Sequence, residues 1–238
     1  EWMLDNYYVV QTAVRQVKTN LPPGYYRRLP RLTETDLAGY PRVYALARAL
    51  IRYFDGHLDL DHIEAFLRVY QEQRPLTMGE LWALPTVLRL ILIELLAQTT
   101  AGLTELEVAA GPDWPFSLAL DEDVADELVV ANCIRSLRAI ETRDWDAYFE
   151  AVSRVEAELR TDPAGVYAEM DFDTRDRYRK IIEYLARFSA RNEPEVTREV
   201  LELAESAATA PEAAEREAHV GYYLVDAGRA KLEARLDY

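Results

Sequence analysis

Apolar side chains recur three or four positions apart along almost the whole chain, which is the spacing of one face of an α-helix. In one such row, Val43, Leu46, Leu50 and Tyr53 follow Pro41, a residue suited to the first turn of a helix. Glycine is sparse, at 9 of 238 residues, whereas β proteins with many tight turns need more of it. We therefore predict helices throughout and no sheet. In the first half of the chain, helices are predicted near residues 3–19, from Pro41 until Asp55-Gly56 ends the helix, and from Thr77 onward. Another is capped by Asp59 or Asp61 and has its apolar face at 63–70. In the second half, helices are predicted near 121–141, 144–160, 164–170, 174–190, 194–208 and 212–236.

The most apolar stretch is residues 84–96, and it is interrupted by Pro85, Arg89 and Glu94. Residues 77–80, Thr-Met-Gly-Glu, have the spacing of a capping box and open this helix. The apolar stretch is shorter than the roughly 20 residues that a membrane-spanning helix needs. It therefore predicts a buried core helix, with a kink or a restart at Pro85.

Loop signals concentrate in residues 99–120, where TTAG and GPDWP occur. We place an irregular joint there, between an N-terminal helical subdomain (1–98) and a C-terminal subdomain of helical hairpins (121–238). The short connectors predict hairpins stacked as a bundle or a short α-solenoid. The two subdomains could also form one continuous domain.

The balance of charge is strongly acidic, with 42 acidic and 27 basic residues and a formal net charge of −15. Such a field repels nucleic acid and anionic membrane surfaces, so neither is an expected partner, and no segment is expected to insert into a membrane. The single cysteine, Cys133, fits a reducing compartment. The chain begins at Glu1 with neither an initiator Met nor a signal-like apolar segment, so we expect a piece of a longer protein.

The sequence lacks the motifs that metal binding and nucleotide binding require. His57, His62 and His219 do not pair with each other or with cysteine at ligand spacing, and no glycine-rich phosphate loop occurs. We therefore expect no metal, no cofactor and no catalytic residue. The Asp-x-Asp pairs at 59/61, 121/123 and 171/173 are interpreted as helix N-caps. The alternative is the metal and nucleotide-sugar site of glycosyltransferases, which follows a strand that is not predicted here. Glycosidase carboxylates are a separate candidate, at Glu80 beside Trp82 or at Asp171 and Asp173 near Tyr178.

Aromatic and arginine residues cluster in YYRR (25–28), at the start of a predicted extended loop, in YPRVY (40–44) and in MDFDTRDRYR (170–179). We interpret these clusters as ion pairs and ring stacks that join helices. In the last cluster one aspartate should cap the helix, and the other should pair with Arg42 or Arg138. The alternative is a sugar-binding surface. Its candidate ligand-binding residues are Tyr25, Arg27, Arg42, Glu80, Trp82, Asp171, Asp173, Arg175 and Tyr178.

Several segments in order along the chain resemble the N-terminal region of bacterial cyclic β-1,2-glucan synthases. They are EWMLDNYY (1–8), LPPGYYRRLP (21–30), GYPRVYAL (39–46), LTMGELWA (76–83), SLR (136–138), DPAGVYAEMDFDTRDRYR (162–179) and HVGYYL (219–224). Between the helix at Leu88-Arg89 and residues 136–138 this chain looks shorter than the family, so some helices of that stretch are expected to be missing.

The resemblance implies membership of a large inner-membrane protein that makes and cyclises β-1,2-glucan from UDP-glucose and carries a phosphorylase-like part. This segment would precede the membrane helices, on the cytoplasmic face. The transferase signature Gln-x-x-Arg-Trp is absent from the sequence. The implied role is a non-catalytic scaffold whose partners are other domains of the same synthase. The alternatives are a β-1,2-glucan-binding module or a helical glycoside-acting domain. Buried rings at Trp82, Trp114, Trp145, Tyr25 and Tyr178 would favour the scaffold, and exposed rings along a groove would favour glucan binding.

Overall fold

Most of the described chain is helical. The computed structural model describes residues 6–104, 118, 120, 124–211 and 214–238. These residues form twelve α-helices and two 3-10 helices without any β-sheet, and an isolated antiparallel bridge joins Arg31 to Pro41. The prediction of an all-α fold is confirmed.

Two compact units divide the chain, residues Glu1–Trp145 and Asp146–Tyr238. The sequence placed a joint at 99–120. Helix α6 extends to Thr104 in that stretch, and residues 105–117 and 119 lie outside the described residues. The division at 98 and 121 therefore stays a prediction.

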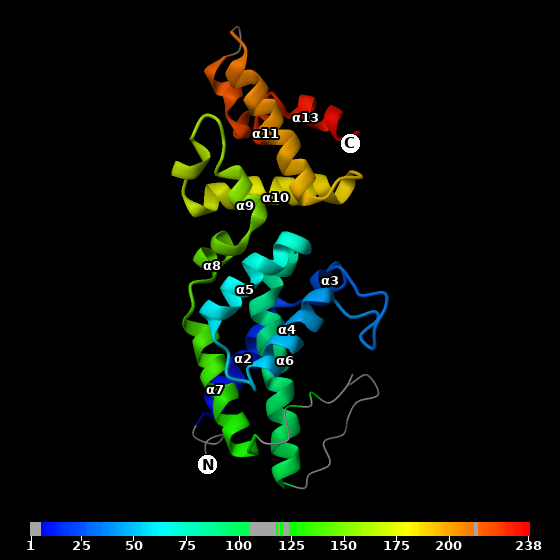
Figure 1. Ribbon diagram of the computed structural model, residues 1–238, viewed down its shortest axis with the longest axis vertical. Coiled ribbons are helices and arrows are strands. Elements are labelled where there is room, and N and C mark those ends of the chain that lie inside the picture. The colour runs from blue at the N-terminus through cyan, green and yellow to red at the C-terminus, as the bar shows by residue number, and fades with distance from the viewer. Residues whose placement is uncertain (1–5, 105–117, 119, 121–123, 212–213) are drawn as a thin grey trace. The chain divides into compact units, whose positions relative to one another are not determined.

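The first unit is arranged around one long helix, α6, which is in contact with α2, α4 and α7 (Figure 1). Its side chains at Leu84, Leu88 and Ile91 are fully buried, as expected for a helix that is apolar on all sides. The helices of this unit are α2 (Tyr7–Asn20), α3 (Pro23–Tyr26), α4 (Arg42–Tyr53), α5 (Leu60–Gln73), α6 (Met78–Thr104) and α7 (Asp126–Thr142).

The start of α6 is the predicted capping box. The backbone N–H of Thr77 donates to Glu80 Oε2 at 2.9 Å, and the backbone N–H of Glu80 donates to Thr77 Oγ1 at 3.2 Å. Downstream, α6 runs through Pro85 without a restart. A proline inside a helix costs about 3 kcal/mol, and burial of the surrounding leucines offsets that cost.

Helix α7 holds the turn between α4 and α5. Ser136 Oγ donates to the carbonyl of Gly56 at 2.7 Å and accepts from the N–H of Leu58 at 2.8 Å. Gly56 has a φ of 75°, a conformation that favours glycine. One hydroxyl therefore satisfies two backbone groups that the turn leaves buried.

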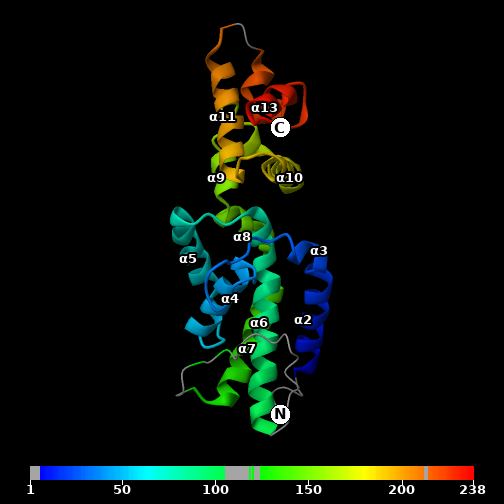
Figure 2. The same cartoon turned by 90° about the vertical axis from the view of Figure 1, so that its right-hand side faces the viewer.

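The second unit packs around α11, which is in contact with α9, α10, α12 and α13 (Figure 2). A capping box starts α11, in which Asn192 and Glu195 exchange hydrogen bonds with each other's backbone N–H. Beginning with α8, the remaining helices are α8 (Trp145–Val152), α9 (Arg154–Leu159), η1 (Tyr167–Glu169), α10 (Phe172–Phe188), α11 (Glu193–Thr209), η2 (Glu215–Ala218), α12 (Val220–Val225) and α13 (Arg229–Arg235).

Four predicted elements are wrong in detail. The single helix at 144–160 is divided at Ser153, whose side chain accepts from the N–H of Glu156 and starts a new helix. The helix predicted at 164–170 is only the 3-10 turn η1, and the one at 212–236 is three short helices. The loop expected at 25–37 overlaps the end of the short helix α3. In the first three cases a local cap, turn or proline outweighs the helical spacing of apolar residues.

Candidate functional site

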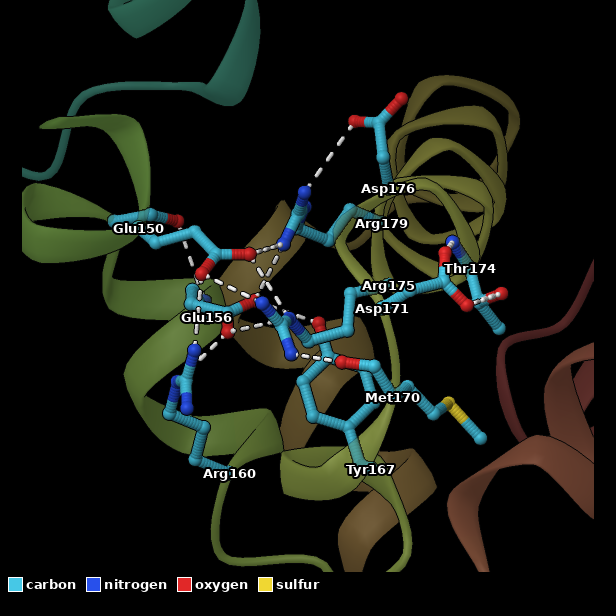
Figure 3. Close-up of polar contacts among 11 residues, drawn as sticks. Glu150, Glu156, Arg160, Tyr167, Met170, Asp171, Thr174, Arg175, Asp176 and Arg179 are labelled. Carbon is cyan, nitrogen blue, oxygen red and sulfur yellow. Dashed lines mark hydrogen bonds and ion pairs between the residues drawn. The ribbon is translucent and has the colours of Figure 1, made fainter. Parts of the chain in front are cut away.

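The densest group of polar contacts lies in the second unit, where α8, α9, η1 and α10 meet (Figure 3). Glu150 comes from α8, Glu156 from α9, Tyr167 from η1, and Arg175 and Arg179 from α10. The break at Ser153 redirects the chain between Glu150 and Glu156, so both carboxylates face α10. We call this group, together with Arg160, the ion-pair cluster.

Arg179 lies at the centre of the cluster and is one of the largest fully buried side chains, at 1% exposure. Its Nη1 donates to Glu150 Oε1 at 3.0 Å and to Glu156 Oε2 at 2.7 Å. The guanidinium carbon lies 5.1 Å from the ring centre of Phe149 and 4.8 Å from that of Phe172. Two aromatic rings and two carboxylates therefore compensate the loss of hydration of this cation.

Arg175 and Arg160 complete the positive side of the cluster. Arg175 binds Glu150 with both ends of its fork, at 2.9 Å from Nε to Oε1 and 2.8 Å from Nη2 to Oε2, and it also donates to the carbonyl of Met170. Arg160 lies 2.8 Å from Glu156 Oε1 and 3.0 Å from Glu150 Oε2. Each glutamate is therefore surrounded by arginines.

The arrangement of the cluster shifts the pKa values of Glu150 and Tyr167. Burial alone would raise the pKa of Glu150, but hydrogen bonds from Arg175 and Arg179 outweigh burial and lower it. Burial raises the pKa of Tyr167, and its hydroxyl also donates to Glu156 Oε2 at 2.6 Å. A general acid for sugar chemistry needs a raised carboxyl pKa, so Glu150 is unsuited to that role.

Two predicted candidates lie beside the cluster without joining it. Asp171 caps α10, with Oδ1 accepting from the N–H of Thr174 at 2.9 Å, and Asp173 is exposed in the first turn. Neither aspartate pairs with an arginine among the described residues of the second unit, and the predicted pairing with Arg42 or Arg138, which lie in the first unit, stays a prediction. Glu150 and Glu156 pair with the arginines of α10 instead, because they face that helix from α8 and α9.

Tyr178 belongs to a separate chain of polar contacts in the second unit. Asp162 accepts from His219 Nδ1 at 2.7 Å and from the N–H of Val220 at 3.0 Å. The other ring nitrogen of His219 lies 3.4 Å from the hydroxyl of Tyr178, whose side chain is 8% exposed. These polar contacts hold the loop before η1 against the start of α12.

In the first unit the structure brings together Tyr25, Arg42 and Glu80. Arg42 binds fully buried Glu80 bidentately, with 2.9 Å from Nε to Oε1 and 2.5 Å from Nη2 to Oε2. The hydroxyl of Tyr25 donates to the carbonyl of Gly79 at 2.5 Å. Trp82 is half-buried and Arg27 is exposed. Tyr25 and Trp145 are also half-buried, and Trp114 lies outside the described residues.

A groove between α4 and α5 is a second candidate site. It encloses about 680 Å³. Two of its rings are open to solvent, Tyr53 at 80% exposure and Phe66 at 44%. The lining residues are Leu46, Ala49, Leu50, Tyr53, Phe54, His62 and Phe66.

The described parts of the chain also show the arrangement of metal-ligating side chains, the single thiol and the apolar helices. No group of three or more His, Cys, Asp and Glu side chains there could hold a metal ion. Burial raises the pKa of the Cys133 thiol to about 12, which makes it unreactive. None of the helices described is both long and apolar enough to cross a membrane.

Sequence comparison shows similarity between this helical chain and a known protein. No protein-family model matches it. Over its whole length it is 32% identical to cyclic beta-(1,2)-glucan synthase NdvB of Rhizobium meliloti (strain 1021). The chain is similar to part of a cyclic β-1,2-glucan synthase. It spans 11% of that synthase, in an alignment of 306 residues against the 238 of this chain, so NdvB carries additional residues in the matched region.

The sequence-based resemblance to cyclic β-1,2-glucan synthases is therefore confirmed for one region of NdvB. Glu150 and Glu156, which organise the ion-pair cluster, were missed by sequence reasoning. The available signal was the i,i+4 spacing of Glu156 and Arg160, but a chain with 42 acidic residues contains many such pairs.

Proposed function

We propose that this chain is a non-catalytic helical scaffold within a longer glucan synthase. It would support the synthesis of β-1,2-glucan from UDP-glucose by other parts of that protein, at the cytoplasmic face of the inner membrane. The similarity to NdvB along the full chain supports a role in glucan synthesis. Its partners would be the other domains of the same synthase.

The observation that carries the scaffold proposal is the pairing of glutamates with arginines from other helices. Glu150 is bound by Arg175 and Arg179, and Glu80 is bound by Arg42. A carboxylate held in this way neither donates a proton to a glycosidic oxygen nor accepts one from water. These side chains join helices, which is what a scaffold requires.

The isolated chain should show no turnover on UDP-glucose, β-1,2-glucan or glucose 1-phosphate. In the full-length synthase, Arg175→Ala should reduce thermal stability and glucan synthesis together, while the exposed Arg191→Ala should change neither. Product formation by the purified chain, abolished by Glu80→Gln or Asp171→Asn, would contradict the proposal. Loss of synthesis by Arg175→Ala at unchanged stability would also argue against it.

Glucan binding in the α4–α5 groove is a second candidate function. It is favoured by the open rings of Tyr53 and Phe66, since aromatic faces pack against the apolar faces of sugars. Calorimetric titration with linear and cyclic β-1,2-glucans tests it. Binding that is lost in Tyr53→Ala and kept in Tyr184→Ala, which removes an exposed tyrosine of the second unit, would support this function. No heat of binding with either glucan would exclude it.

A further inference from the structure

Charge is distributed unevenly along this acidic chain. Residues 6–33 contain no aspartate or glutamate, although an average of 42 acidic residues in 238 predicts about five in a stretch of 28. The same stretch carries five cations. They are Arg15, Lys18, Arg27, Arg28 and Arg31.

The structure places these five cations, which we call the basic edge, on consecutive surface elements. Two lie on α2 and three follow α3, which begins three residues beyond the end of α2 (Figure 2). All five side chains are exposed, and none forms an ion pair with the described residues. Arg28 and Arg31 donate only to the backbone carbonyls of Gly24 and Gly39.

Several arginines elsewhere in the chain are paired with carboxylates. Arg42, Arg143, Arg160, Arg175 and Arg179 each contact at least one carboxylate. Exposed arginines without an ion pair among the described residues also occur elsewhere, at Arg177 and Arg191 for example, so the basic edge is distinguished by the lack of any acidic residue between its cations.

We propose that the basic edge docks on an anionic phospholipid surface. A partner protein normally presents both signs of charge, and its binding face would tolerate some acidic residues. A membrane of anionic lipids is negative throughout, so it disfavours every acidic residue that faces it. Tyr7 and Tyr8, exposed by 59% and 58% in the same stretch, suit the headgroup region.

The net charge of −15 does not oppose this docking. At physiological ionic strength, charges more than about 8 Å from the surface are largely screened. The acidic residues outside the stretch 6–33 act on the lipid only where they lie within that distance. The charge close to the membrane therefore decides whether the chain binds. The proposal replaces the expectation, drawn from the net charge alone, that anionic membranes are repelled.

The test is sedimentation of the chain with phosphatidylcholine vesicles prepared with or without phosphatidylglycerol. We expect binding only to the vesicles that contain phosphatidylglycerol, and weakening as salt is raised. Each cation removed should lower the partition coefficient roughly fivefold, so Arg15→Gln combined with Arg27→Gln should lower it about 25-fold. Neither of these two side chains has a hydrogen bond or ion pair among the described residues, so folding should be retained, as circular dichroism can verify.

The matched control is Arg177→Gln combined with Arg191→Gln, which removes the same charge from exposed positions of the second unit. Its vesicle binding should stay within about twofold of wild type. Equal loss in both double variants would overturn the proposal, because net charge alone would then explain binding. So would displacement by inorganic phosphate at constant ionic strength, which indicates a site for a free anion. Binding to neither vesicle would also overturn it and would leave an acidic protein face as the partner.

Discussion

Glu156 and Arg179 form a buried ion pair, with 2.7 Å between Oε2 and Nη1 and side-chain exposures of 0% and 1%. The pair connects α9 to α10, two helices that the break at Ser153 and the turn η1 place side by side. Removing two charges from water costs several kcal/mol per ion, and only their mutual attraction and further hydrogen bonds repay it. Arg160 and Tyr167 supply those further contacts to Glu156.

Arg179→Met should lower the free energy of unfolding by about 3–5 kcal/mol, because Glu156 would keep its burial and lose its closest cation. Urea unfolding followed by circular dichroism measures this change. The control is Arg177→Met, an exposed change on the same helix, which should stay within about 0.5 kcal/mol of wild type. Equal unfolding midpoints for the two variants would contradict the structural role of Arg179.

Arg175→Ala, Asp171→Ala and Arg191→Ala should rank in that order of thermal destabilisation. Arg175 is 12% exposed and forks onto Glu150, whereas Asp171 is an exposed helix cap and Arg191 is an exposed residue between helices. Sequence reasoning alone expects a change at either 171 or 175 to destabilise the chain far more than one at 191, and the structure ranks Arg175 above Asp171. Scanning calorimetry checks the order, and a larger effect at Asp171 than at Arg175 would reverse our assignment of the main polar contact.

Asp162→Asn should destabilise the chain at neutral pH, and the difference from wild type should shrink in acid. Burial acts to raise the pKa of Asp162, but hydrogen bonds from His219 and from the N–H groups of Val220 and Tyr167 outweigh burial and lower it. The stabilisation is therefore complete above the unfolded pKa of about 3.9 and is lost as pH falls through the lower folded pKa. Urea midpoints measured in steps from neutral to acid pH test this. A difference that grows toward acid would show that the sign is wrong.

Gly56→Ala should be more damaging than Gly165→Ala. Both glycines have positive φ, at 75° and 68°, so alanine is strained at either position, by about 1 kcal/mol. A Cβ at Gly165 would meet no atom within 4 Å, but one at Gly56 would lie 3.1 Å from Cys133 Sγ. We expect a further loss of about 1 kcal/mol at Gly56 in urea unfolding. Equal losses would mean that α7 yields easily at Cys133.

Much of the fold follows from local sequence. Helical spacing, the capping box at Thr77 and Glu80, and the Asp59 cap act within a few residues, and the structure contains each of them. Ser153 shows the limit of this reasoning. The apolar spacing continues across it, so only the observed cap reveals that α8 ends and α9 begins.

The candidate site was much less predictable. The segment at 170–179 was expected to organise the polar contacts, and Arg175 and Arg179 do so. An aspartate of that segment was expected to pair with Arg42 or Arg138, and no carboxylate partner from another helix was foreseen for Arg175 and Arg179. These partners are Glu150 and Glu156. Which carboxylate meets which arginine depends on how helices cross, and residue spacing does not encode that.

The sequence by itself determined the helical class, the positions of most helices, the resemblance to glucan synthases and the basic stretch at 6–33, because these depend on neighbours along the chain. Only the tertiary structure decided that the cations of that stretch are exposed and form no ion pair with the residues described, while Arg179 is buried among carboxylates and rings. The physical reason is desolvation. An arginine is positive and a glutamate is negative wherever each occurs in the sequence. The electrostatic energy of each side chain depends on which groups the fold brings around it and how much water the fold removes.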